Sequence, residues 1–208
     1  MKIEQTQPIR LGGGIALTLA LISLAGWLAP AERTLGSNLG LILVHGAWVW
    51  AGLAAFALAG VAGLVGLALR SAPWHGWSGA LGRTGMTMWL TYLPMSLVVQ
   101  QVNWGGIFWD EPRWRIPFTF GVVGLLLHIG LALLDDPRLT SGANALFGAA
   151  LGWSLLRADY IMHPQSPISS SGGAIQFSFA LLLVLALVLM AQITLLWRLG
   201  SRARRDAQ

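Results

Sequence analysis

The segment LGLILVHGAWVWAGLAAFALAGVAGLVGLAL (residues 39–69) contains no Asp, Glu, Lys or Arg. A helix needs about 20 mostly apolar residues to cross a bilayer, so this longer segment is expected to tilt or to project beyond the hydrocarbon. Polar and apolar residues do not alternate along it, which excludes a strand of a membrane β-barrel. The segment therefore predicts a transmembrane helix.

Five further apolar segments lie on either side of this helix. The six predicted spans are residues 11–29, 39–69, 84–102, 116–134, 142–157 and 174–197. The apolar run of the first is longer than that of a typical signal peptide, about 7–15 residues, so we expect it to be retained. The sequence thus predicts an all-α polytopic membrane protein, a six-transmembrane-helix bundle that forms a single membrane domain over residues 1–208.

The composition of the 208 residues excludes several classes of protein. Charged residues make up 10% of the chain and hydrophobic residues 55%, whereas soluble domains carry about 25% charged residues. A soluble enzyme and a nucleic-acid-binding protein are therefore poor fits. The chain has no cysteine, which excludes disulfides, thiolate nucleophiles, zinc–cysteine sites and haem linked through thioethers.

Basic residues in the connecting segments predict the orientation. Nine of the 13 lie on the side of the two termini, namely Lys2, Arg10, Arg70, Arg83, Arg138, Arg198, Arg202, Arg204 and Arg205. The other face carries Arg33, Arg113, Arg115 and Arg157. Because Lys and Arg are enriched in cytoplasmic loops, both termini are predicted to be cytoplasmic.

Small residues predict close packing between helices. Glycine recurs in the second predicted helix and again in the fifth, at Gly52, Gly60, Gly63, Gly66, Gly148 and Gly152. Glycine lets two helix backbones approach without large side chains between them, so we expect a tight bundle.

The predicted outer face has three connecting loops, residues 30–38, 103–115 and 157–173. The second reads NWGGIFWDEPRWR and is called the Trp-rich loop. It carries Trp104, Phe108, Trp109, Asp110, Glu111, Arg113, Trp114 and Arg115. Such rings can anchor at lipid headgroups as an aromatic belt. They can equally form a flat platform for a planar ligand with carboxylates, on which rings stack and arginines pair with the acids.

Four histidines are candidate ligands. His45 lies near the outer end of the second helix and His163 in the third outer loop, so the pair could ligate a haem iron from opposite sides. Either could instead make an ordinary hydrogen bond between helices. His128 lies on the inner half of the fourth helix, where we expect a structural interhelical bond. His75, in the inner loop 70–83, is expected at the membrane interface.

The order of these features resembles the haem-handling membrane proteins of cytochrome c maturation, the CcmC type. LAPAERTLGSNLGLILVHGAW is similar to that family's passage from its first outer loop into a histidine-bearing helix. NWGGIFWDEPR occupies the place of its tryptophan-rich "WWD" segment, and IMHPQSPISSSG that of its second outer histidine. The resemblance extends from about residue 20 to residue 198.

The resemblance implies a function in haem transport for cytochrome c-type biogenesis at the bacterial inner membrane. The axial histidines, and hence the ligands of the haem iron, would be His45 and His163. The haem b would lie against Trp104 and Trp109, with Asp110 and Arg113 matching the family's Asp and Arg. Family members pass haem to a periplasmic haem chaperone, and an associated ABC transporter drives release of the loaded chaperone.

The Trp-rich loop departs from the family pattern, because Ile107 and Phe108 stand near the place of paired tryptophans. A second hypothesis is therefore a haem-binding subunit of a larger electron-transfer or respiratory complex. A third is a structural or assembly subunit.

We do not expect the chain to be an enzyme. No Ser/His/Asp order stands out and no phosphate-binding loop is present. Asp135 and Asp136 are expected to cap the inner end of the fourth helix.

Overall fold

The computed structural model describes residues 2–33, 35–159, 161 and 168–206, with side chains from residue 7 to residue 201. Within these residues the chain forms six α-helices and no β-strand. They are α1 (Lys2–Trp27), α2 (Leu39–Leu69), α3 (Ala72–Trp104), α4 (Pro112–Leu134), α5 (Pro137–Leu156) and α6 (Gly173–Asp206). The predicted all-helical fold is confirmed.

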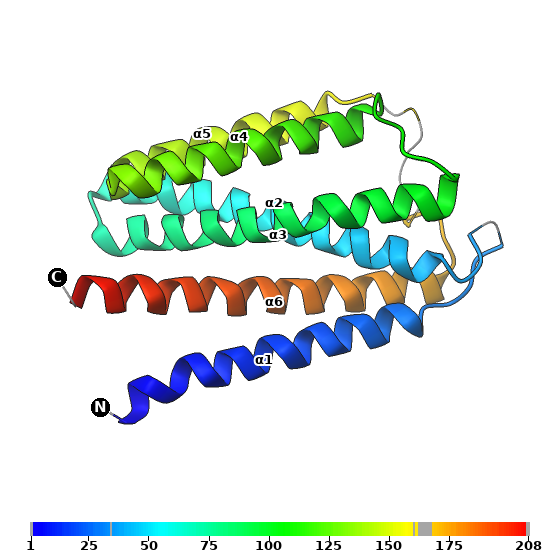
Figure 1. Ribbon diagram of the computed structural model, residues 1–208, viewed down its shortest axis with the longest axis horizontal. Helices are drawn as coiled ribbons and strands as arrows, with labels where there is room; N and C mark the ends of the chain where they lie inside the picture. Colours follow the sequence, from blue (N-terminus) through cyan, green and yellow to red (C-terminus); the bar gives the residue numbers. More distant parts are fainter. Residues whose placement is uncertain (1, 34, 160, 162–167, 207–208) are drawn as a thin grey trace.

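Successive helices run in opposite directions along one bundle (Figure 1). The two termini and the short α2–α3 and α4–α5 connections lie at one end, here called the terminal end. The connections after α1, α3 and α5 lie at the other, here called the loop end. The described parts of the three loops that were expected on one face therefore share one end of the molecule.

Several helices extend beyond the predicted apolar segments. α3 begins at Ala72 rather than at residue 84, and α1 begins at Lys2. Ser71 is extended and Pro73 stands in the first turn of α3, an arrangement that favours a helix start. Helical hydrogen bonding continues through polar residues, so apolarity marks where a span lies and not where its helix begins.

The two aspartates between α4 and α5 have different roles. Asp135 is the left-handed C-cap residue of α4, with φ 47°. Asp136 instead caps the N-terminus of α5, because its Oδ1 accepts hydrogen bonds from the backbone N–H groups of Arg138 and Leu139 at 2.7 and 3.2 Å. The expectation that both residues cap the fourth helix was wrong for Asp136.

In the part of the chain that the structure describes, four helices are long and apolar enough to cross a membrane. Their candidate spans are Gln7–Trp27, Leu39–Leu69, Pro112–Leu134 and Gly173–Ser201. Large apolar side chains are exposed along them, for example Leu17, Leu64, Leu126 and Val184. Because a soluble protein does not expose so much apolar surface, the fold is that of a helical membrane protein.

α2 is the central helix and packs against α1, α3, α5 and α6. On one side of it, Leu43 and Ala51 contact a cluster that includes Leu182 and Leu189 of α6. On the other side, Phe56 packs in a second cluster of mostly aromatic residues from α3 and α5. That cluster comprises Phe56, Met86, Trp89, Tyr92, Phe147 and Leu151.

Glycines allow the close contact between α2 and α5. A Cβ atom on Gly63 would lie 2.5 Å from the Ser141 carbonyl oxygen, and one on Gly148 would lie 3.1 Å from the Phe56 carbonyl oxygen. Gly63 therefore requires a residue without a side chain, and Gly148 stands at a tight contact in which a side chain would press on the Phe56 backbone. The predicted close packing is confirmed at these two glycines, whereas Gly152 faces open space and takes no part in it.

Candidate functional site

His45 lies in the second turn of α2, at the loop end of the bundle, and is half-buried. Its ring packs against Tyr92 of α3, with the ring centroids 5.1 Å apart and the planes tilted by 42°. The Nδ1 atom is excluded from solvent. The close packing of α2 on α3 thus holds one candidate ligand against an aromatic wall.

A continuous group of aromatic side chains supports this wall. Trp89 is completely buried, packs 5.1 Å from Tyr92, and its indole N–H donates to the Pro117 carbonyl oxygen of α4 at 3.0 Å. The Tyr92 hydroxyl and the Ser96 side chain form a hydrogen bond. Tyr92 is therefore held in place by its contact with Trp89 and its hydrogen bond with Ser96. Tyr92 in turn restricts the position of the His45 ring that packs against it.

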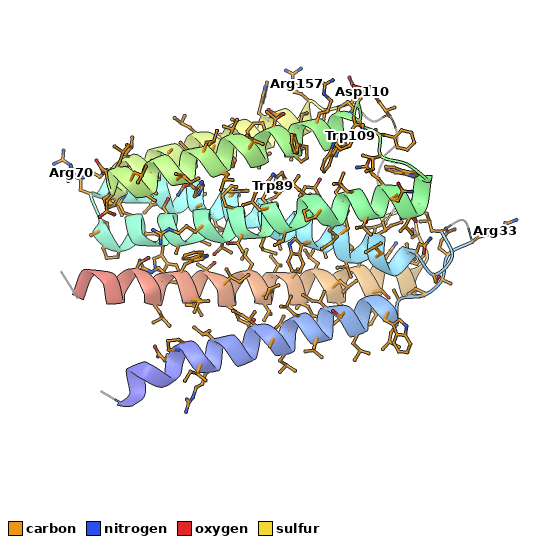
Figure 2. The ribbon with its side chains drawn as sticks, viewed as in Figure 1. Arg33, Arg70, Trp89, Trp109, Asp110 and Arg157 are labelled. Atoms are coloured by element: carbon orange, nitrogen blue, oxygen red, sulfur yellow. The ribbon has the colours of Figure 1, made fainter. Side chains whose placement is uncertain are left out.

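The Trp-rich loop connects α3 to α4 beside this group. α3 ends after Trp104 because Gly105 adopts a left-handed conformation, with φ 70°, and α4 begins at Pro112. Figure 2 shows Trp109 and Asp110 at the loop end, whereas Arg70 projects from the terminal end. The loop and His45 therefore lie at the same end of the bundle.

The rings of this loop meet in pairs. Trp104 and Phe108 have centroids 6.0 Å apart with planes at 74°, and Trp109 and Trp114 have centroids 6.1 Å apart with planes at 62°. Edge-to-face pairs are a stable arrangement of aromatic rings, but their planes do not form one flat sheet. Trp114 is only 3% exposed, whereas Trp109 is 60% exposed, so Trp109 offers the largest accessible tryptophan face of the loop.

The charged residues of the loop differ sharply in environment. Asp110 and Arg115 form an ion pair at 3.7 Å between two exposed side chains, where water screens the attraction. Glu111 is buried and accepts from the Arg113 backbone N–H at the start of α4. The half-buried Arg113 lies within electrostatic range of the Tyr92 hydroxyl. Arg113 therefore brings positive charge to the buried side of the loop.

The third outer loop meets the Trp-rich loop at a shallow pocket. Its walls are formed by Ile107, Phe108, Trp109, Asp110, Glu111 and Ile161. Ile161 precedes His163 by two residues. His163, the second predicted axial ligand, lies outside the described residues, so the structure gives no distance between it and His45.

The other two histidines make structural contacts. The Nδ1 atom of His128 lies 2.9 Å from the Gly124 carbonyl oxygen, one turn earlier in the same helix, and the ring also interacts with the Gly82 backbone of α3, in the direction of the expected interhelical bond. His75 lies on α3 and is only 6% exposed, and its Nδ1 atom is 2.7 Å from the Ser141 hydroxyl oxygen of α5. The expectation that His75 lies in a loop was wrong, because α3 begins before it.

Gln100 is a site residue that the sequence reasoning missed. It lies in the last two turns of α3, is 2% exposed, and its Oε1 accepts from the Phe108 backbone N–H at 3.0 Å. This bond ties the Trp-rich loop to α3. The sequence feature that could have indicated this residue is the polar pair Gln100-Gln101 at the end of an apolar span. The pair alone does not show which of the two side chains faces the protein.

No group of three or more His, Asp or Glu side chains that could hold a metal ion occurs in the described part of the chain. Comparison with models of known protein families and with curated proteins finds no match for this sequence. The proposals below therefore rest on the residues of the chain and their arrangement.

Proposed function

We propose that the chain binds haem b at the outer face of a membrane, between His45 and His163 and beside the Trp-rich loop, and hands it on for cytochrome c assembly. The observation that carries the proposal is that three separate features come together at the loop end. His45 packs on Tyr92, the Trp-rich loop lies at the same end, and the third loop shares a pocket with it.

The residues at the loop end suit this ligand. Haem supplies an iron that takes axial imidazoles and a planar macrocycle that carries two carboxylates. His45 offers an imidazole on a rigid helix, and Trp109 offers an exposed indole face. Arg113 offers a guanidinium that can pair with a carboxylate. The paired geometry of the rings means that single tryptophan faces, rather than a continuous platform, would contact the macrocycle.

The membrane arrangement belongs to the same proposal. α3 and α5 complete six spans, and polar side chains of α3 are sheltered because α2, α4, α5 and α6 pack around that helix. Nine of the 13 basic residues fall on the side of the termini, which would be cytoplasmic in a bacterial inner membrane. Haem would then be held at the periplasmic face, within reach of a periplasmic haem chaperone and of an ABC transporter in the same membrane.

A second function is favoured by one observation. Trp114 is buried and Glu111 is fixed as the cap of α4, so part of the Trp-rich loop is folded into the bundle. A loop held in this way suits a permanently bound haem in a larger electron-transfer complex, where no handover surface is needed. Transfer of haem to a haem-free periplasmic chaperone separates the two functions, because only the first predicts it.

Binding of haem to the purified full-length protein tests the proposal. We expect a haem absorption band that is lost in His45→Ala and in His163→Ala. His128→Ala is the matched control, because its ring interacts with Gly124 of α4 and Gly82 of α3, away from the loop end, and it should keep the band. A protein that binds no haem, or that binds it equally well without either outer histidine, would contradict the proposal.

A further inference from the structure

The side-chain amide of Gln100 has one satisfied end and one unsatisfied end. Its Oε1 accepts from the Phe108 backbone N–H at 3.0 Å. A backbone N–H can only donate, so the oxygen must face Phe108 and the Nε2 group must face the other way. The orientation of this amide is therefore set by chemistry and not by a choice between two equivalent fits.

The Nε2 group of Gln100 is buried and makes no hydrogen bond to the described part of the chain. The whole side chain is only 2% exposed. Buried polar groups are nearly always hydrogen-bonded, and an unpaired one is costly. A buried donor held in place without an acceptor is consistent with a position for an acceptor that belongs to a bound molecule.

The surroundings of Gln100 favour a negatively charged acceptor. Tyr92, Ser96 and Gln100 recur every four residues and so share one face of α3. Arg113 is close enough to Tyr92 for its charge to act on the phenol. The nearby guanidinium of Arg113 therefore favours a carboxylate as the acceptor for Gln100.

We propose that Gln100 is a ligand-binding residue whose Nε2 group donates a hydrogen bond to a carboxylate of the bound molecule. The inference rests on the proposed function, in which that carboxylate is a haem propionate. Gln100 then contacts the ligand through its nitrogen and the Trp-rich loop through its oxygen. Occupation of the site and the position of the loop are thereby coupled through one side chain.

Haem b and its dimethyl ester distinguish this role from a purely structural one. The two ligands share iron and macrocycle, but esterification removes both negative charges. Gln100→Glu keeps an oxygen that can accept from Phe108 and replaces the donor by an acceptor. Gln100→Met removes both interactions with little change in length. Gln101→Leu is the matched control, because the neighbouring Gln101 is exposed.

We expect Gln100→Glu to weaken the binding of haem b by about 10- to 100-fold, the range for a lost hydrogen bond to a charged group. Its effect on the dimethyl ester should be less than about threefold by the same reasoning, because the ester carries no charge. Gln100→Met should likewise weaken the binding of haem b more than the binding of the dimethyl ester. Gln101→Leu should bind both ligands like the unmodified protein.

The inference is overturned if the Gln100 variants bind haem b and the ester with the same loss, since Gln100 would then only hold the loop. This outcome differs from failure of the proposed function, in which the unmodified protein shows no haem band at all. Thermal unfolding of each variant without ligand verifies that a loss of binding does not arise from a loss of fold.

Discussion

The contact between α2 and α5 gives the sharpest prediction about the fold, and Gly63→Ala tests it. A Cβ atom at this position would lie 2.5 Å from the Ser141 carbonyl oxygen and 3.0 Å from the Ser78 hydroxyl oxygen. The first of these neighbours is helix backbone, which cannot rotate away. The two helices must therefore move apart to admit a single methyl group.

The structure sets the size of the effect. Carbon and oxygen atoms in close contact lie about 3.5 Å apart, so α5 must retreat by about 1 Å near Ser141. The same region holds the hydrogen bonds of His75 with Ser141 and of Asn144 with Ser78, which this movement stretches. Overpacking of this kind costs about 1–3 kcal/mol. For a chain of this length that corresponds to a fall in unfolding temperature of about 2–12 °C.

Thermal unfolding of the full-length protein in detergent measures the prediction. Gly142→Ala is the matched control, because Gly142 adjoins Ser141 on α5 and a Cβ atom there meets nothing within 4 Å. The control should unfold at the temperature of the unmodified protein or up to about 4 °C higher, since alanine is more stable than glycine in an open helical position by less than about 1 kcal/mol. Equal unfolding temperatures for the two variants would refute the close α2–α5 contact.

Two further substitutions follow from the structure. Trp89→Phe removes the bond from the indole N–H to the Pro117 carbonyl oxygen and part of a fully buried ring, so we expect a loss of about 2–3 kcal/mol in thermal unfolding. Stability unchanged by that substitution would contradict the docking of α4 on α3. Backbone donors at Leu139 and Arg138 hold the pKa of the Asp136 carboxyl below its usual range. Asp136→Ala should therefore lower the unfolding temperature at neutral pH, and the deficit should shrink as the pH falls through the lowered pKa, below about 3.9. Asp136→Ser keeps a capping oxygen and should lose less at neutral pH, and a deficit independent of pH would contradict the role of the charge.

The sequence predicted the fold well where apolarity alone decides it. The uncharged segment that becomes α2 had its bounds predicted correctly, and all six helices were expected. The start of α3 was missed because residues 72–83 contain three glycines and a proline together with polar side chains, and their helical state depends on packing against α2 and α5. His75 shows the consequence, since only the tertiary structure provides Ser141 as its partner.

The candidate site was predictable in its residues but not in its geometry. Residue types placed His45 and the Trp-rich loop at one end of the bundle, where the structure has them. Sequence could not reveal that Trp114 is buried and Trp109 exposed, because both belong to the same short Trp-rich loop. Their exposed fractions differ because Trp114 packs into the bundle as part of α4. The burial of Gln100 could not be predicted for the same reason. Gln101 beside it has the same side chain but is exposed.

We propose that His45 and His163 bind one haem iron from opposite sides. An experimental structure of the full-length protein loaded with haem b measures this directly, through the distances from the iron to the two imidazole nitrogens. We predict that each distance is about 2 Å, as in ordinary metal–imidazole bonds, with the two nitrogens about 4 Å apart. Haem ligated by other residues, or His45 and His163 too far apart to share an iron, would contradict the account.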